Sequence, residues 1–218
     1  MVYTTLDELA NPRHSALILV DMQQDFCLPG GALERHGADI SIYSTIIPKL
    51  ATLLDSARDM RLLVVHLQMS ALPDGRSDSP AQHRFNMLTR TAVNGLDQPL
   101  RYAVEGSEGQ QFVPTLSPKP GDVVVKKYRS SGFWGTNLDM ILRSNGVQTV
   151  VITGCTTEGC VESTARDALF NDYYVVVVED CVASDDPQQH DASLLLMRHR
   201  FDLATSVDVM ATWRRLPS

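Results

Sequence analysis

Three side chains suited to nucleophilic catalysis each follow a short apolar run of the sequence. Asp21 closes one run, Lys127 lies at the end of a second, and Cys160 follows a third by a few residues. A thiol at the start of a helix is favoured as thiolate, and the free N–H groups there can hold an oxyanion. Cys160 is therefore either a nucleophile, with Asp21 as its base and Lys127 holding charge, or a small buried core residue.

Two of the other cysteines, Cys155 and Cys181, are predicted to be structural. Cys155 and Cys181 lie at strand ends, and Cys27, in an expected binding loop, is predicted not to be the nucleophile. Four scattered cysteines make no disulfide framework, and without a C-x-x-C pair no structural zinc site is indicated. No glycine-rich phosphate loop follows any strand, and no G-x-S-x-G elbow is present, which disfavours a serine hydrolase.

The elements that position these residues are apolar, β-branched runs alternating with helical patterns. The runs are residues 16–21, 62–67, 122–126, 149–153 and 174–179, with a weaker sixth at 201–207; the helices are 44–59, 136–144, 160–171 and 187–199. Continuous apolar runs suit strands covered on both faces. We predict one domain over residues 1–218, a Rossmann-like three-layer α/β/α sandwich with a mainly parallel sheet of about six strands.

Two long stretches, 23–39 and 68–121, interrupt this alternation and are expected to be irregular. Loops of this length are usually functional, and open α/β sheets bind ligands beyond the carboxyl ends of their strands. Whether the 68–121 stretch is a lid or an interface stays open.

Composition excludes several classes of protein. The 218 residues are 44% apolar and carry a net charge of −7, with no apolar run long enough to span a bilayer. This charge argues against nucleic acid or an anionic membrane as the main partner. No signal-peptide pattern opens the chain, so a cytoplasmic location is expected.

Three motifs in order resemble those of the isochorismatase-like cysteine hydrolases. They are ALILVDMQQDF at 16–26, VKKYRSSGF at 125–133 and GCTTEGCVESTARDA at 154–168. The resemblance implies that Cys160 attacks a carbonyl carbon and forms a thioester. It implies that Asp21 accepts the thiol proton and returns it to the leaving amine, while Lys127, rather than Lys126, keeps the pair correctly charged.

The same resemblance implies details of the surrounding site. A cis peptide bond is expected between Cys155 and Thr156, with the backbone N–H groups of Thr156 and Cys160 as the oxyanion hole. Further substrate-binding candidates are the aromatic residues Phe26, Phe133 and Trp134, as pocket walls or as ordinary core, and Arg129, facing a substrate carboxylate or solvent.

The sequence departs from the metal-binding members of the family. Nicotinamidases carry an Asp-x-His pair and a second His, whereas residues 65–68 read VHLQ and His83 stands alone. We therefore expect no metal and no cofactor.

The lysine and nucleophile segments look closest to the ureidoacrylate and biuret hydrolases, which implies release of ammonia from a small carbamoyl or ureido amide. Alternatives are an isochorismatase- or nicotinamidase-like hydrolase, or a non-catalytic binding module. By analogy, a homodimer or homotetramer is expected.

Overall fold

In the computed structural model, which describes residues 2–90 and 101–216, six parallel strands form one sheet in the order β3-β2-β1-β4-β5-β6. The strands are β1 (Ser15–Val20), β2 (Leu63–Met69), β3 (Val123–Lys127), β4 (Thr149–Cys155), β5 (Tyr174–Ala183) and β6 (Asp202–Ala204). The order reverses between β1 and β4. In open α/β sheets such a reversal leaves a crevice at the carboxyl ends of the two strands.

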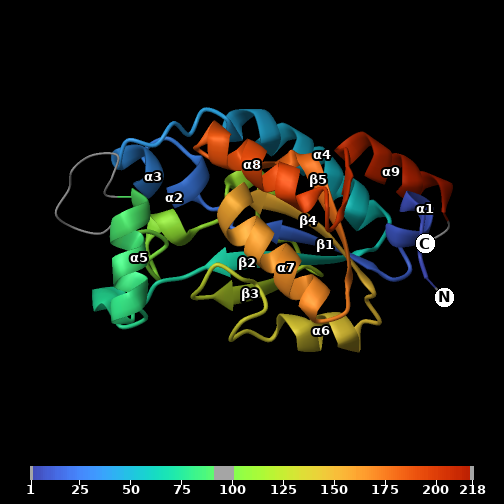
Figure 1. The fold of residues 1–218 in the computed structure, drawn as a ribbon, viewed down its shortest axis with the longest axis horizontal. Helices are drawn as coiled ribbons and strands as arrows, with labels where there is room; N and C mark the ends of the chain where they lie inside the picture. The colour runs from blue at the N-terminus through green and yellow to red at the C-terminus, as the bar shows by residue number, and fades with distance from the viewer. Residues whose placement is uncertain (1, 91–100, 217–218) are drawn as a thin grey trace.

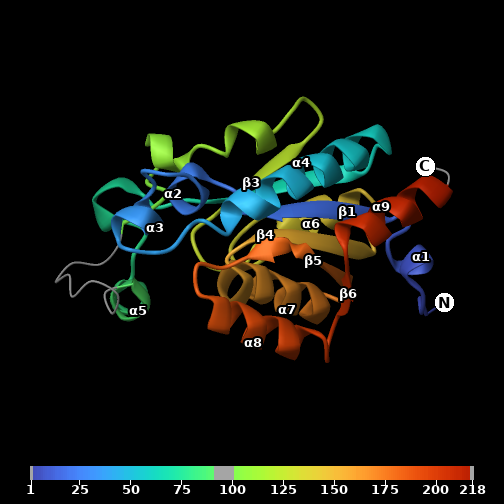
Figure 2. The same ribbon diagram turned by 90° about the horizontal axis from the view of Figure 1, so that it is seen from above.

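Helices cover both faces of the sheet (Figure 2). The described helices are α1 (Leu6–Leu9), α2 (Gln24–Cys27), α3 (Ala32–Arg35), α4 (Tyr43–Asp59), α5 (Pro80–Arg90), α6 (Leu138–Ser144), α7 (Glu162–Phe170), α8 (Pro187–Met197) and α9 (Ser206–Arg215). Helices α2, α3 and α5 gather at one end of the molecule, and both chain termini lie at the other (Figure 1).

Alternate residues of the central strand face two separate cores. Leu17 and Leu19 pack in the core that contains the buried residues of α4 and α9. Ala16, Ile18 and Val20 face the opposite core, to which α6 and α7 contribute. Both faces of β1 are thus buried, which is why its sequence is continuously apolar rather than alternating.

The predicted α/β fold with a parallel sheet of about six strands is confirmed, with differences in the elements. The stretches predicted to be irregular contain short helices: α2 and α3 lie within 23–39, and α5 lies within 68–121, of which residues 91–100 fall outside the described residues. Helices α1 and α9 were not predicted. Strand β5 continues beyond Glu179 to Ala183, and the predicted helix at 160 begins instead with a π-helical turn, Thr157–Val161.

Within the described residues, no helix combines the length and the apolar character that crossing a membrane requires.

Candidate active site

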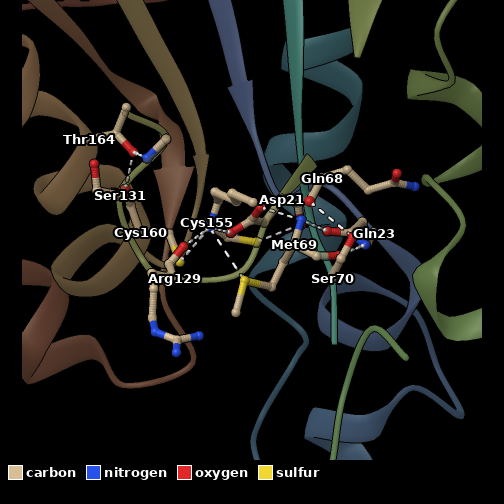
Figure 3. A network of polar contacts seen from close by, with 12 residues as sticks. Asp21, Gln23, Gln68, Met69, Ser70, Arg129, Ser131, Cys155, Cys160 and Thr164 are labelled. Atoms are coloured by element: carbon tan, nitrogen blue, oxygen red, sulfur yellow. Dashed lines mark hydrogen bonds and ion pairs between the residues drawn. The ribbon is translucent and has the colours of Figure 1, made fainter. Parts of the chain in front are cut away.

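Three strands bring the predicted catalytic side chains to one edge of the sheet. Asp21 directly follows β1, Lys127 is the last residue of β3, and Cys160 lies in the π-helical turn after β4. Because β1, β3 and β4 are parallel, their carboxyl ends lie at the same edge. Dashed lines in Figure 3 trace the polar contacts that join Asp21 and Cys160 to their surroundings.

Lys127 contacts both of the other members of the group. Its Nζ lies 2.7 Å from Asp21 Oδ2 and 3.2 Å from Cys160 Sγ. A third bond, to the carbonyl of Arg129 at 3.1 Å, fixes the direction of the ammonium group. The Lys127 side chain is fully buried, so these contacts replace water around a charge that would be costly to bury alone.

The Asp21 carboxylate is held from the other side by backbone. The Met69 N–H donates to Oδ1 at 3.0 Å and also to the Gln23 side chain at 2.8 Å. Asp21 itself has a φ of 50°, a left-handed conformation that Asp tolerates better than most residues and that turns the chain away from β1. The carboxylate is thereby fixed between Met69 and Lys127.

The protonation states follow from burial and from the two opposite charges. Burial raises the pKa of Asp21 against the opposing effect of Lys127. Burial lowers the pKa of Lys127, but Asp21 and Cys160 more than offset it, so that pKa lies above its usual value. Burial raises the pKa of Cys160 to about 12 despite the neighbouring ammonium. The helix terminus favours thiolate, but burial outweighs it, and Cys160 keeps its proton at neutral pH.

The turn that carries Cys160 is shaped by its neighbours. The peptide bond between Cys155 and Thr156 is cis, as the family resemblance implied. Gly154 has a φ of 108°, and a Cβ there would lie 2.1 Å from the carbonyl oxygen of Val20 in the adjacent strand. Only glycine therefore fits at the point where β4 gives way to the turn.

A cavity of about 860 Å³ opens beside the predicted catalytic side chains. Its wall includes Asp21, Thr156 and Gly159, which places the cavity next to Cys160 and the predicted oxyanion hole. Phe26 also lines it, and its ring lies 5.3 Å from the ring of Tyr102, centroid to centroid.

The other three predicted substrate-binding residues do not line this cavity. Phe133 is buried in the core, where its ring lies 5.8 Å from that of Tyr173. Trp134 is 66% exposed. Arg129 donates to the carbonyls of Tyr128 and Ser77, with its guanidinium 6.0 Å from the Trp134 ring centroid. Phe133 therefore has the core position that was the alternative to a pocket wall, and the Arg129 guanidinium is bonded to backbone carbonyls.

Sequence reasoning missed several residues that line the cavity. Phe85 and Tyr102 lie in the long stretch after β2, whose position over the site nothing in the sequence specifies. Glu158 and Ser163 lie inside the nucleophile motif and also line the cavity. Their proximity to Cys160 in the sequence could have identified them as residues of the cavity wall.

The remaining cysteines are buried, as predicted. Cys155 donates to the carbonyl of Asp21 at 3.3 Å, and its sulfur lies 3.8 Å from that of Cys27. Cys181 is fully buried in the core beside α4 and α9. Cys160 is only partly buried, so it is the most accessible thiol in the described part of the chain.

Comparison with known proteins gives a matching family model and similar solved structures. The isochorismatase domain model matches residues 15–209. A cysteine hydrolase from Pseudomonas syringae pv. phaseolicola superposes with a TM-score of 0.80 and 26% identity, over 94% of both chains. N-carbamoylsarcosine amidase from Thermoplasma acidophilum shares 30% identity, over 88% of this chain and 96% of its own, with a TM-score of 0.68. Pyrazinamidase of Pyrococcus horikoshii, solved in complex with zinc, shares 31% identity over 88% and 99%, with a TM-score of 0.71.

Proposed function

The chain belongs to the isochorismatase family of hydrolases, and we propose that it is a cysteine amidohydrolase whose Cys160 forms a thioester with a small amide. The proposed bond is the C–N bond of a carbamoyl or ureido compound, and the proposed leaving group is ammonia. The similarity to N-carbamoylsarcosine amidase supports this class of bond.

One observation carries the proposal: a single buried ammonium group contacts both the carboxylate and the thiol. Lys127 lies 2.7 Å from Asp21 and 3.2 Å from Cys160, beside the cavity. It stabilises the carboxylate as a proton acceptor and the thiolate once the proton has moved. A structural core would gain nothing from burying these three groups together, since apolar residues of similar volume would serve as well.

Acylation begins with transfer of the Cys160 proton to Asp21. The sulfur attacks the carbonyl carbon of the amide, and the C=O electron pair moves onto oxygen. When that oxyanion collapses, Asp21 gives its proton to the departing nitrogen, so the C–N bond breaks and neutral ammonia leaves. The high pKa of the Cys160 thiol makes this base necessary, because little thiolate exists at neutral pH without it.

Deacylation repeats the same proton transfers with water. Asp21 removes a proton from water as the oxygen attacks the thioester carbon. Collapse of the second tetrahedral intermediate breaks the C–S bond, and the thiolate recovers its proton from Asp21. Lys127 remains protonated throughout, because its pKa lies above the usual lysine value.

The oxyanion of both intermediates is assigned to backbone N–H groups. Thr156 lines the cavity and Cys160 lies in the first turn of the helical segment, where N–H groups lack partners within the helix. Donors of this kind typically contribute about 3–4 kcal/mol to transition-state stabilisation.

The described side chains do not fit a zinc ion. Across residues 2–90 and 101–216, no three His, Cys, Asp or Glu side chains gather as metal ligands do. His66, the histidine of β2, is buried against Asp122, with its Nε2 3.1 Å from the carboxylate. The proposed hydrolysis therefore proceeds with Asp21, Lys127 and Cys160 alone.

A panel assay of ammonia release tests the function. Biuret, ureidoacrylate, N-carbamoyl amino acids, nicotinamide and simple primary amides would be compared, with isochorismate followed by loss of its vinyl-ether absorbance. We expect a carbamoyl or ureido amide to give the highest kcat/KM. Cys160→Ala should abolish turnover, while Cys181→Ala, the same change in the core, should preserve it. Preference for isochorismate, or no hydrolysis of any amide, would overturn the proposal.

A further inference from the structure

The wall of the active-site cavity is rich in carboxylates. Asp39, Glu158, Asp185 and Asp186 line it together with Asp21, whereas no Lys, Arg or His does so among the described residues. Asp21 is neutralised by Lys127 at 2.7 Å. Because the wall contributes four further acidic side chains and no basic one from the described part of the chain, the space beside Cys160 is negative.

These carboxylates differ in what they bind. Asp186 accepts hydrogen bonds from the backbone N–H groups of Gln188 and Gln189 as the N-cap of α8, and Asp39 accepts one from Ser41. Glu158 differs, because its Oε2 is buried and has no hydrogen-bond partner in the described structure. Because this oxygen receives no hydrogen bond from the described part of the chain, it is available to a donor or a cation that enters the cavity.

Aromatic rings form another part of the same wall. Phe26 and Tyr102 lie with ring centroids 5.3 Å apart, and Phe85 lines the cavity as a half-exposed ring. Aromatic faces attract ammonium groups through their quadrupole, most strongly where water is excluded. Carboxylates and aromatic faces around one space are the two features that bind organic cations.

We propose that the substrate is an amide carrying an ammonium or other cationic group, which pairs with Glu158. This inference deepens the proposed amidohydrolase function and rests on it. Within the ureido branch, it excludes carboxylate-bearing compounds such as ureidoacrylate. The cavity of about 860 Å³ lies within the range for small-molecule sites.

Glu158 is placed to determine specificity rather than to perform chemistry. It lies two residues before Cys160 in the same π-helical turn, and Gly159 between them also lines the cavity. A cation paired with Glu158 therefore lies close to the scissile carbonyl. Its binding orients the amide toward the sulfur, and Glu158 takes no part in the proton transfers.

Charged thiol reagents test the charge of the site without any knowledge of the substrate. Cys160 would be modified with methanethiosulfonates that carry either a trimethylammonium or a sulfonate group. The rate constant of each reagent with Cys160 would be divided by the rate constant of the same reagent with free 2-mercaptoethanol, which corrects for the reagent's intrinsic reactivity. Both reagents meet the same thiol, so its pKa cancels from their ratio. We expect the cationic reagent to react roughly tenfold to a hundredfold faster, the usual size of one charge-assisted contact. Loss of the modification in Cys160→Ala would identify Cys160 as the thiol that reacts.

The role of Glu158 is tested by the isosteric change Glu158→Gln. It should lower the cation-to-anion rate ratio by about tenfold. Glu179→Gln is the matched control, because Glu179 pairs with Arg198 away from the cavity and its loss should leave the ratio unchanged. The cation-to-anion rate ratio of the wild-type protein is measured without any variant. It therefore decides the charge preference of the cavity even if Glu158→Gln fails to fold.

A matched amide series gives a second readout: β-alaninamide, butyramide and succinamate differ at one end by a positive, a neutral or a negative group. The highest kcat/KM is expected for the ammonium compound, with Glu158→Gln raising its KM more than it lowers its kcat. If amides are hydrolysed but succinamate is preferred, or if the sulfonate reagent reacts as fast as the cationic one, this inference is wrong and the amidohydrolase proposal stands. If no amide in any panel is hydrolysed, the proposed function fails and the reagent ratio alone decides the charge of the site.

Discussion

Removing Lys127 should destabilise the protein strongly, and removing Asp21 with it should recover much of the loss. The side chains of Lys127 and Asp21 are 0% and 2% exposed, and their charged atoms lie 2.7 Å apart. Lys127→Met leaves the carboxylate buried without its counter-charge, which costs about 3–5 kcal/mol. Asp21→Asn leaves the Lys127 ammonium buried without its counter-charge, so a similar cost is expected.

The double variant Asp21→Asn with Lys127→Met contains neither charge. The amide oxygen introduced by Asp21→Asn can still accept the Met69 N–H, because that bond uses Oδ1 alone. The double variant should therefore lose less than the sum of the single changes, by at least about 3 kcal/mol. For a chain of this size, each single change would lower Tm by roughly 6–20 °C.

Denaturant unfolding of the four proteins measures this coupling directly, from midpoints and slopes analysed together. All three variants should be inactive, so activity cannot stand in for stability here. A Lys127→Met cost below about 1 kcal/mol, or strict additivity of the two changes, would show that the pair is not the buried ion pair described above.

Three further predictions concern pH, metal and backbone. The pH profile of kcat/KM should lose activity as pH falls through the raised Asp21 pKa, hence at a pH above the ordinary carboxyl value of 3.8. Its plateau should continue past pH 9.0, the ordinary thiol value, because Cys160 keeps its proton to about 12. Dialysis against a chelator should leave kcat unchanged; loss that zinc or manganese restores would contradict the metal-free mechanism. Gly154→Ala should lower both stability and turnover, since its Cβ would meet the Val20 carbonyl at 2.1 Å; a wild-type unfolding midpoint would contradict that steric argument.

The strands and the cluster of Asp21, Lys127 and Cys160 were predictable because their signals are local. The run from Ala16 to Val20 is apolar on both faces, and burial on both faces is what the structure shows. Asp21 and Cys160 could be placed at one edge because parallel strands end together. The helix α9 also has a local signal, because Thr205 and Asp208 form a capping box whose spacing is visible in the sequence.

Most of the cavity wall could not be predicted because it is assembled from distant segments. Tyr102 reaches Phe26 from a separate part of the chain, and no local pattern specifies which ring faces the cavity. Phe133 and Trp134 are neighbours in sequence, yet one is buried in the core and the other is exposed. Residue type alone could not separate these outcomes, which depend on how the segment packs in the folded chain.

The most direct test of the account is the turnover of Cys160→Ala with the best amide found by the ammonia assay. The variant must first show a wild-type unfolding midpoint, so that a loss reports chemistry rather than folding. Without the sulfur no thioester can form, and kcat should fall by about 10⁴-fold or more, as when other catalytic nucleophiles are removed. Retention of more than a few per cent of the wild-type rate by the folded variant would contradict the proposal that Cys160 is the nucleophile.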